Sequence, residues 1–427
     1  MARVLLLATT TGYQIRAFGE AAERLGVDLV FATDRCHMLD DPWMDRAVPV
    51  RFHDERSSVT AVLEAARSRP IDGVLAVGDQ PTVVAALVNE ALGLPGHPSF
   101  AAAAARNKLA TRERLRSAGL AVPAFAQYSL SVNPHLLASS VTFPAVVKPL
   151  ALSGSRGVMR VNDQEEMVTA YYRLRSLLQS ADVRAEHNSA HEFVLVEEFI
   201  PGREFAIEGV MNHGSLHVLA VFDKPDPLDG PFFEETIYVT PSRLLQSEQR
   251  LLTNTIARAT GALGLRHGPI HAECRINERG AFVLEVAARP IGGLCARALR
   301  FVQSADPIVE VSLEELLLRH ALGEWSTTWR REHLASGVMM IPIPRRGVFR
   351  GVSGLDGARS VPGISDVRLT AKNDQVLVPL PEGASYLGFI FARGTLPDDV
   401  EFALRSAHTR LRFDIDPEVP VLQSLHG

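Results

Sequence analysis

The chain has 427 residues, a length that predicts two or three domains rather than one. Its composition, 46% hydrophobic and 22% charged, is that of a globular protein and excludes a largely disordered chain. The formal net charge of −5, without a dense run of lysine and arginine, argues against nucleic acid as a partner.

The N-terminal stretch and the cysteines bear on the compartment. About five apolar residues open the chain before polar residues follow, too few for a signal-peptide core or a membrane span. We therefore expect a cytoplasmic protein that does not act in a membrane. Cys36, Cys274 and Cys295 are odd in number and lack CxxC spacing, which favours ordinary thiols over a disulfide framework or a zinc site.

The first hundred residues alternate predicted strands with predicted helices. Apolar stretches predict strands over residues 3–8, 28–32 and 73–77. A helix is expected over residues 14–25, so the unit is a parallel sheet with helical crossovers. The turn TTTGYQ after the first strand lacks the GxGxxG spacing of a dinucleotide-binding fold.

Two polar residues, Asp79 and Gln80, follow the third of these strands. Open α/β sheets usually bind ligands at the carboxyl ends of their strands. A ligand contact and a helix N-cap explain Asp79 equally well.

Breaks in the pattern divide the rest of the chain. LPGHPS interrupts the structure near residues 95–105, before a helical run over residues 101–119. A charged, tryptophan-containing stretch near residues 325–340 marks a second change. We expect three domains: residues 1–100, residues 101–325 with a lid subdomain over about 120–200, and a cap of residues 326–427. The cap is expected to contain short strands and one helix over residues 397–411.

The segment HAECRINERGAFVLEVAAR predicts two strands joined at ERG. A three-residue loop with Gly280 in the left-handed conformation is a favoured hairpin connection, and it pairs Asn277 with Ala281. Stepping outward along both strands places Glu273 opposite Glu285. Two facing carboxylates about 5 Å apart repel each other, so we expect a cation between them.

Two kinds of cation fit between Glu273 and Glu285. Mg²⁺ takes one or two carboxylates and completes its shell with phosphate and water. The same strand face also carries His271, Arg275, Ala287 and Arg289. A surface salt-bridge network of Arg275 and Arg289 is therefore the alternative, and the spacing alone favours the metal only slightly.

Lys148 ends the predicted strand FPAVVKP, and the loop LSGSRG follows it. One ammonium group and several free backbone amides at such a place suit an anion, as in phosphate-binding loops. The sequence is not a Walker A motif, and an ordinary surface turn explains this motif equally well when it is taken alone.

In VLVEEFIPGREFAIEG an apolar strand ends in two carboxylates, turns at PG and resumes as a second strand that begins with Glu204. A hairpin of this composition offers an apolar slot for adenine, backbone donors and acceptors, and a carboxylate for a ribose. The alternative is a solvated hairpin, which would leave Phe199 and Ile200 exposed.

Five sequence elements follow one another along the chain. They are NK at residues 107–108, Lys148, GSRG at residues 154–157, EEFIPGREF at residues 197–205, and Glu273 and Glu285 with Arg289. In this order they resemble the ATP-grasp superfamily, and the resemblance covers roughly residues 1–325. It implies an α/β (α+β) ATP-grasp fold preceded by a Rossmann-like domain and followed by a cap similar to the C-terminal region of biotin carboxylases.

The resemblance also assigns the nucleotide-binding residues. Lys108 and Lys148 resemble the lysines that contact ATP phosphates, and Glu204 resembles the ribose-binding carboxylate. The mobile lid over the phosphates corresponds to Ser153, Gly154, Ser155 and Gly157. The adenine hinge corresponds to Glu197, Glu198, Phe199 and Ile200, whose backbone atoms are expected to contact the base.

The catalytic centre follows from the same resemblance. Glu273 and Glu285 match the magnesium ligands, and Arg289 resembles the cation that stabilises the acyl phosphate. Ala287 stands where many family members carry a metal-ligating Asn, so the number of magnesium ions, one or two, stays open. Manganese can take their place.

Within the superfamily, EVAARPIGG, FDKPDPLDGPFFEET and SYLGFIFARG are most similar to the L-amino-acid ligase branch. That branch implies a loop near the acceptor that carries Asp223, Lys224, Glu234 and Glu235. It also implies that His271 faces the reacting centre as a catalytic residue, although a satisfied strand histidine explains His271 equally well.

The resemblance implies an ATP- and magnesium-dependent ligase that activates a carboxylate as an acyl phosphate and transfers it to an amine. The substrates would be small amino-acid-like molecules, and ADP and phosphate would be released. Two other functions also fit: a biotin-carboxylase-like or purine-pathway ATP-grasp enzyme, and a non-catalytic ATP-binding module. A homodimer is the expected assembly.

Overall fold

The computed structural model describes residues 1–9, 14–34, 47–303 and 306–418, with no side-chain account for residues 306 and 307. Cys36 and most of the turn TTTGYQ lie outside the described residues. The chain opens with a sheet of strand order β3-β2-β1-β4, whose pairs are all parallel, as predicted. The strands are β1 (Arg3–Ala8), β2 (Asp28–Thr33), β3 (Ala47–Pro49) and β4 (Gly73–Val77).

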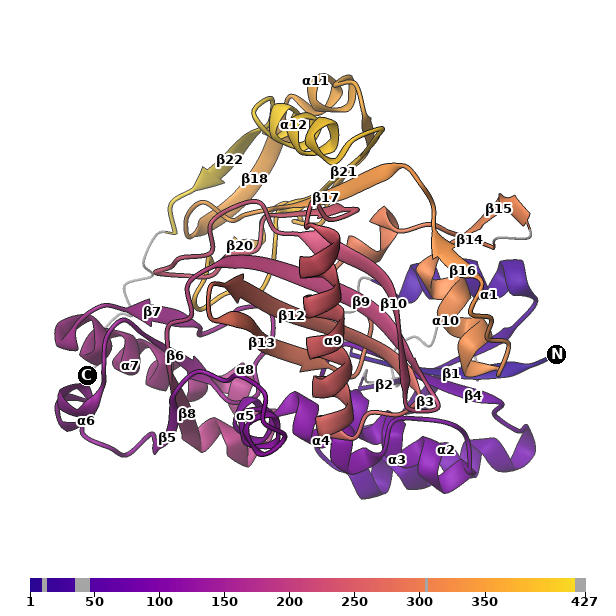
Figure 1. Cartoon of the computed structure of the whole chain (residues 1–427), viewed down its shortest axis with the longest axis horizontal. Helices are drawn as coiled ribbons and strands as arrows, with labels where there is room; N and C mark the ends of the chain where they lie inside the picture. Colours follow the sequence, from indigo (N-terminus) through magenta and orange to yellow (C-terminus); the bar gives the residue numbers. More distant parts are fainter. Residues whose placement is uncertain (10–13, 35–46, 304–305, 419–427) are drawn as a thin grey trace, which may run out of the picture.

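Helices connect or follow these strands and lie on the faces of the sheet (Figure 1). They are α1 (Ile15–Leu25), α2 (Glu55–Ser68) and α3 (Thr82–Leu92). Because the strands are parallel, their carboxyl ends share one edge of the sheet, and Asp79 follows β4 at that edge.

The helical run after this unit is two helices, α4 (Ser99–Arg106) and α5 (Lys108–Ser117). Asn107 between them has an extended backbone, and its side chain accepts the N–H groups of Leu109 and Ala110 at 3.0 and 3.1 Å. The predicted helical run is therefore interrupted at this residue, because Asn caps a helix better than it continues one.

The next unit, which we call the lid, has a sheet of strand order β5-β8-β6-β7. Its strands are β5 (Phe125–Ser129), β6 (Ala145–Pro149), β7 (Met159–Val161) and β8 (Phe193–Glu198). Its helices are α6 (Pro134–Ser140), α7 (Gln164–Leu178), α8 (Ala181–Arg184) and η1 (Ser189–Glu192). Buried residues of α7, including Tyr171 and Leu174, pack against the strands and close a separate apolar core.

The largest sheet in the described chain has eight strands in the order β13-β12-β9-β10-β11-β17-β21-β19. Its strands are β9 (Arg203–Asn212), β10 (Ser215–Asp223), β11 (Ile237–Thr240), β12 (Gly268–Asn277), β13 (Gly280–Ala287), β17 (Ala335–Ile341), β19 (Ile364–Leu369) and β21 (Gly388–Gly394). Strands β17, β19 and β21 come from the predicted cap, so the cap continues the same sheet.

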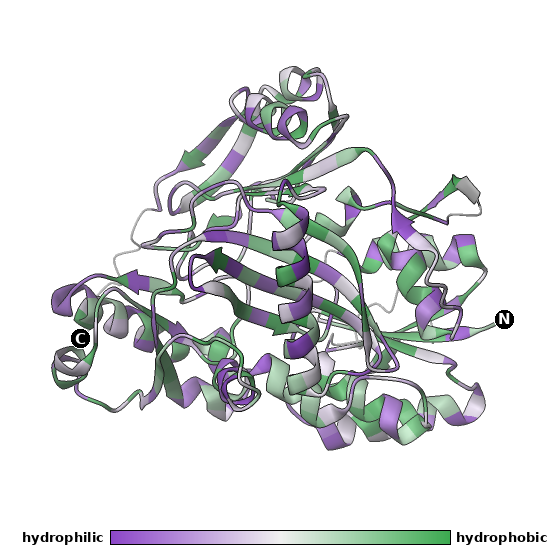
Figure 2. Ribbon diagram, viewed as in Figure 1, coloured by the Kyte–Doolittle hydropathy of each residue, from purple (hydrophilic) through white to green (hydrophobic). Residues whose placement is uncertain are grey.

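Helix α9 (Gln246–Leu263) crosses one face of this central sheet (Figure 1). Along β12, Ala272 and Cys274 are buried in one apolar cluster with side chains of α9. The intervening residues, His271, Glu273 and Arg275, belong to the other face by the period of two. Hydrophobic and hydrophilic residues accordingly alternate along β12 (Figure 2). The polar face is the one that can form a site.

Smaller elements complete the chain. One three-stranded sheet consists of β14 (Phe301–Gln303), β15 (Asp306–Val311) and β16 (Trp329–Arg331), near η2 (Cys295–Ala298) and α10 (Leu313–Ala321). A second consists of β18 (Gly347–Ser353), β20 (Val376–Leu377) and β22 (Arg412–Asp416). The predicted helix of the cap is α12 (Pro397–His408), and the cap also contains a shorter helix, α11 (Leu355–Arg359).

Two further observations concern the helices and the cysteines of the described chain. The described part of the chain contains no helix with the length and apolar character needed to cross a lipid bilayer. Cys274 and Cys295 are buried free thiols, and burial raises the pKa of each, which fits the expectation of ordinary cysteines.

Candidate active site

A cavity of about 750 Å³ lies where the N-terminal sheet, the lid, the central sheet and the cap meet. Its wall includes Asp79 of the N-terminal unit, Lys148 of the lid and Tyr386 of the cap. It also includes these predicted site residues: Lys108, Lys148, Ser153, Gly154, Ser155, Glu197, Glu198, Phe199, Ile200, Glu204, His271, Glu273, Glu285 and Arg289. Segments more than three hundred residues apart in sequence, at Asp79 and Tyr386, therefore share one cavity.

Three neighbouring strands build the polar floor of this cavity. Strand β12 pairs with β9 so that His271 lies opposite Glu208 and Arg275 opposite Glu204. On its other side β12 pairs with β13 so that Glu273 lies opposite Glu285, as predicted. Cross-strand partners share a face, and the sheet therefore gathers these ionisable groups in one place.

The turn that joins β12 to β13 differs from the prediction. Asn277 pairs with Gly280 rather than with Ala281, so only two residues form the turn, although Gly280 does have a positive φ of 119°. A β-bulge between the pairs Cys274–Val283 and Glu273–Glu285 adds one residue to β13. The bulge offsets the shorter turn, which is why the predicted carboxylate pair still forms.

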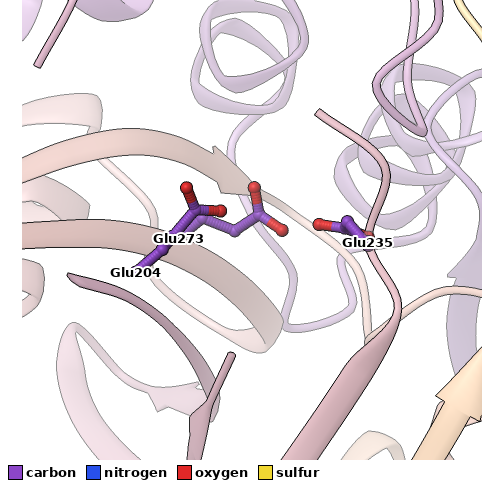
Figure 3. A group of neighbouring side chains, drawn as sticks. All are labelled: Glu204, Glu235 and Glu273. Atoms are coloured by element: carbon purple, nitrogen blue, oxygen red, sulfur yellow. The ribbon is translucent and has the colours of Figure 1, made fainter. Parts of the chain in front are cut away.

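A lysine lies among three carboxylates on this floor. Glu204 and Glu273 extend from adjacent strands, and Glu235 approaches from the segment before β11 (Figure 3). The Lys224 ammonium group donates to Glu204, Glu235 and Glu273 at 2.8, 2.6 and 2.8 Å. The Tyr238 hydroxyl donates to Glu235 at 2.8 Å. In this structure the cation beside Glu273 is thus the ammonium group of Lys224.

Glu235 and Glu273 differ in their affinity for protons. Burial and the neighbouring charge of Glu273 raise the pKa of Glu235 to about 7. Burial also acts on Glu273, but the charge of Lys224 and the bonds to its neighbours outweigh it and hold its pKa well below the ordinary value. Glu273 is therefore an anion at neutral pH.

The donor set fits a hard divalent cation. Carboxylate oxygens of Glu204, Glu235 and Glu273 can lie within 4.8 Å of one another, and Glu285 faces Glu273 across the strand pair. Oxygen ligands of this kind are those that Mg²⁺ prefers. Glu273 and Glu285 remain the predicted magnesium ligands, with Glu204 and Glu235 close to Glu273.

The alternative of a surface network of two arginines is wrong. Arg275 is buried and donates to Glu204 at 2.9 Å and to the Ile200 carbonyl at 2.7 Å. Arg289 is also buried, and it pairs with Asp79. Among the described residues neither arginine forms an ion pair with the Glu273–Glu285 pair, because each has a closer carboxylate partner.

His271 is both a cavity residue and a strand histidine with a partner. Its Nδ1 lies 3.1 Å from a Glu208 oxygen, and its Nε2 lies 3.7 Å from Glu273. Burial disfavours the charged ring, but these two carboxylates outweigh it and raise the pKa of His271 to about 9. The imidazole is protonated at neutral pH, which suits an electrophilic contact better than proton abstraction from an amine.

Lys148 is held at the boundary between lid and helix α5. Its ammonium group lies 2.5 Å from Glu197, and Arg112 contacts the same carboxylate at 2.7 Å. Burial, together with the positive charges of Arg112 and Lys108, lowers the pKa of Lys148 to about 8 in spite of Glu197. A bound anion beside Lys148 would favour the charged ammonium group and oppose this lowering of its pKa.

The glycine-rich loop after Lys148 contacts the cap. Gly157 does not line the cavity; its N–H donates to the Pro381 carbonyl at 2.8 Å. Arg156 donates to the Glu382 carbonyl at 2.8 Å. At the other end of the loop the Lys108 ammonium donates to the Leu152 carbonyl at 2.6 Å. In this structure both ends of the loop are hydrogen-bonded to other segments. Movement of the loop stays a prediction.

The prediction that EEFIPGREF forms a hairpin was wrong. Strand β8 belongs to the lid sheet and β9 to the central sheet, so residues 199–202 connect two sheets instead of forming a hairpin turn. Phe199 and Ile200 are buried, 7% and 5% exposed, which excludes a solvated turn. An apolar slot for a flat base remains, although the Phe199 N–H already donates to Pro144 and the Ile200 carbonyl accepts from Arg275.

The predicted acceptor loop divides into two parts. Lys224 and Glu235 belong to the carboxylate cluster in the cavity. Asp223 instead accepts from Arg243, and Glu234 is outside the cavity wall. In an extended chain, adjacent side chains point to opposite sides. Of the pairs Asp223–Lys224 and Glu234–Glu235, only one member each therefore belongs to the carboxylate cluster.

Sequence reasoning missed several residues at the site. Tyr238 and Arg112 contact predicted site carboxylates, and Tyr386 reaches the cavity from the cap. Glu208 is fully buried, and burial raises its pKa. The alternation of Glu204 and Glu208 along β9 could have indicated Glu208, whereas no local pattern marks the other three.

Comparison with known families matches three parts of the chain. Residues 19–96 match an ATP-grasp N-terminal domain, and residues 141–298 match an ATP-grasp domain. Residues 339–416 match an L-amino acid ligase C-terminal domain 2. The matched parts lie in the domain order that the resemblance implies.

Two curated relatives carry informative names. Carnosine synthase 1 of Gallus gallus is 30% identical over 70% of this chain and 32% of its own length. An alanine–anticapsin ligase of Bacillus subtilis is 26% identical over 62% of this chain and 57% of its own length. The match thus spans about a third of the first relative and somewhat more than half of the second.

Solved structures match almost the whole chain. An L-amino acid ligase from Bacillus licheniformis superimposes with a TM-score of 0.81 at 27% identity, covering 97% of this chain and 99% of that one. A phosphoribosylglycinamide synthetase from Anaerococcus prevotii has a TM-score of 0.66 at 14% identity, with 97% and 100% covered, which shows the shared fold. The chain therefore belongs to the ATP-grasp superfamily of ligases, and its domain order and fold are similar to those of an L-amino acid ligase.

Proposed function

We propose that the protein joins the carboxylate of one amino-acid-like molecule to the amine of another, with ATP as the energy source and magnesium as the metal. The observation that carries the proposal is one cavity lined by two lysines, a facing carboxylate pair and Arg289. Relatives named carnosine synthase and alanine–anticapsin ligase, and a similar L-amino acid ligase, support the substrate class.

The reaction divides into two transfers. In the first, a carboxylate oxygen of the donor attacks the γ-phosphorus of ATP, the bond to the β-phosphate oxygen breaks, and ADP leaves. In the second, the neutral amine of the acceptor attacks the acyl carbon, the bond to the phosphate oxygen breaks, and phosphate leaves with an amide formed. The amine also loses one proton to a base of the site or to solvent.

The residues of the chain have separate parts in these steps. Lys108 and Lys148 would bind the phosphates, and the slot at Phe199 and Ile200 would take the adenine. Glu273 and Glu285 would hold magnesium, which supplies charge neutralisation on the phosphates when it is bound. Arg289 would stabilise the negative charge that develops on the transferred phosphoryl group and the acyl phosphate.

The direct test is release of ADP and phosphate from Mg-ATP with the twenty standard L-amino acids, singly and in pairs. Hydroxylamine added to single amino acids traps an acyl phosphate as a hydroxamate and thereby names the donor. We expect release that depends on two amino acids and a hydroxamate from one of them. Release that depends on bicarbonate or formate instead, or ATP binding without any release, would refute the proposal.

Variants of the carboxylate pair test the site. Glu273→Gln and Glu285→Gln remove one charge each without changing size, and we expect phosphate release to fall by at least about a hundredfold. Glu278→Gln is the matched control, because Glu278 is exposed at the turn of the same hairpin. Circular dichroism checks that each variant is folded. Unchanged release in either site variant would remove that residue from the site.

A further inference from the structure

Asp79, the ion-pair partner of Arg289, has no part in the steps described so far. The guanidinium donates through Nε to Oδ1 of Asp79 at 2.8 Å and through Nη2 to Oδ2 at 3.0 Å. Its Nη1 donates to the Pro290 carbonyl at 3.0 Å. One edge of the arginine expected at the acyl phosphate is therefore occupied by a carboxylate from the N-terminal unit.

Asp79 lies in the cavity wall as a permanent anion. Its side chain is 16% exposed, and that of Arg289 is 10% exposed. Burial alone would raise the pKa of Asp79, but the charge and hydrogen bonds of Arg289, with help from Lys108 and Ser153, outweigh it and lower the pKa. The cavity therefore presents fixed charges of opposite sign side by side.

The structure argues against the alternative explanation of Asp79 as a helix cap. Helix α3 has Pro81 at its N-cap position, without a side-chain hydrogen bond. It is the backbone carbonyl of Asp79 that accepts from the Thr82 hydroxyl at 2.7 Å. The carboxylate is directed elsewhere, to Arg289 and into the cavity. Local folding of α3 thus does not account for a carboxylate at this position.

A simple carboxylate substrate meets an obstacle at this pair. If the substrate carboxylate binds Arg289, Asp79 loses at least some of its hydrogen bonds to Arg289. Asp79 is then a buried anion without full neutralisation, which costs free energy. An α-amino acid removes the obstacle, because it carries an ammonium group on the carbon next to its carboxylate. Its two charges match the neighbouring charges of Arg289 and Asp79.

From this geometry we infer that Asp79 binds the α-ammonium group of the donor substrate while Arg289 binds its carboxyl end. The inference rests on the proposed function and makes it more specific: the donor is an α-amino acid with a free amino group, which becomes the N-terminal residue of the product. Held by Asp79, that amino group stays protonated and does not serve as the nucleophile. The acceptor amine then comes from the second substrate.

The hydroxylamine reaction isolates the donor half-reaction and therefore suits the test. The probes are the amino acid that gives the strongest hydroxamate signal and its desamino analogue, for example L-alanine and propionate. We expect wild-type protein to prefer the amino acid by roughly a hundredfold or more in kcat/KM, since the analogue leaves a buried charge without a partner. Equal use of both probes by wild-type protein would overturn the inference without any variant.

Asp79→Asn keeps the shape of the side chain and removes its charge. We expect this variant to lose most of the preference, through a higher KM for the amino acid and an unchanged or improved reaction of the desamino acid. Asp28→Asn is the matched control, because Asp28 forms an ion pair with Arg69 at the opposite edge of the same sheet. An equal loss for both probes would mean that Asp79 only orients Arg289, and it would overturn the inference.

Equilibrium binding keeps the inference separate from the proposed function. Calorimetry with the same two probes, in the presence of Mg-ADP, requires no turnover. Binding of the amino acid that depends on Asp79, without any phosphate release from ATP, would refute the ligase function and support the inference. Dipeptide formation with an unchanged probe preference in Asp79→Asn would support the function and overturn the inference.

Discussion

At the scale of single residues, buried charges are matched by specific partners. Arg112 has no exposed surface, and its guanidinium contacts both oxygens of Glu197, at 2.7 and 3.2 Å. It also donates to the carbonyls of Val283 and Leu284 at 3.2 and 2.9 Å. One side chain on α5 therefore links strand β8 of the lid sheet to strand β13 of the central sheet.

Loss of Arg112 should destabilise the protein. Arg112→Met fills a similar volume but removes one of the two buried cations paired with Glu197, and Lys148 remains as the other. The cost should therefore lie at or below the about 3–5 kcal/mol of breaking an isolated buried pair. We expect a clear fall in the midpoint of thermal unfolding, followed by circular dichroism. Arg116→Met makes the same chemical change on the exposed side of the same helix and should have a much smaller effect. Equal midpoints for the two variants would contradict this account.

At the scale of elements, the glycine-rich loop is shaped by two glycines in different surroundings. Gly154 and Gly157 have positive φ values of 63° and 76°. A Cβ at Gly157 would lie 2.9 Å from Leu174 and 3.2 Å from Pro149, whereas a Cβ at Gly154 would meet nothing within 4 Å. The loop is thus packed against α7 at Gly157 and has open space around Gly154.

The two glycines form a matched pair of variants. Gly154→Ala should cost about 1–2 kcal/mol from the left-handed backbone alone. Gly157→Ala should cost a further ~1–3 kcal/mol, because the added methyl group overlaps the side chains of α7. Thermal unfolding measures the difference in stability, and the KM for ATP measures the effect on the loop. A Gly154 variant as destabilised as the Gly157 variant would exclude packing as the cause.

At the scale of the whole molecule, a neutral histidine joins the N-terminal unit to the central sheet. His97 Nε2 lies 3.1 Å from the Pro269 carbonyl, and Nδ1 accepts from the Arg266 N–H at 3.2 Å. These bonds need a neutral ring with its proton on Nε2. Burial, only partly opposed by the carbonyl, lowers the pKa of His97 from 6.5 to about 4.

This lowered pKa predicts an acid-sensitive fold. Between pH 6.5 and pH 4 the unfolded chain binds a proton at His97 that the folded protein does not, so stability falls as the pH drops through this range. At pH 5 the loss relative to pH 7 is about 2 kcal/mol. Denaturant unfolding of wild-type, His97→Gln and the exposed control His333→Gln at both pH values measures it. A decrease as large in His97→Gln as in wild-type would contradict this assignment.

Much of the geometry of the candidate site was predictable from the sequence because its signals are local. Alternation along HAECRIN separates Ala272 and Cys274 from His271 and Glu273, and adjacent strands of a hairpin must face each other. The strand-end Lys148 and the order of the five elements need no knowledge of distant contacts. A cytoplasmic location and a homodimer stay predictions from the sequence.

Only the tertiary structure decided which charges neutralise one another. Lys224 among three glutamates, and Arg289 on Asp79 across 210 residues of sequence, depend on how the sheets meet. The same holds for the chain at residues 199–202, which passes between two sheets where a hairpin was expected. Backbone periodicity is set by neighbouring residues, so sequence determines which face a side chain takes. Ion pairing depends on separations of a few ångströms between elements, and only the packed fold sets these.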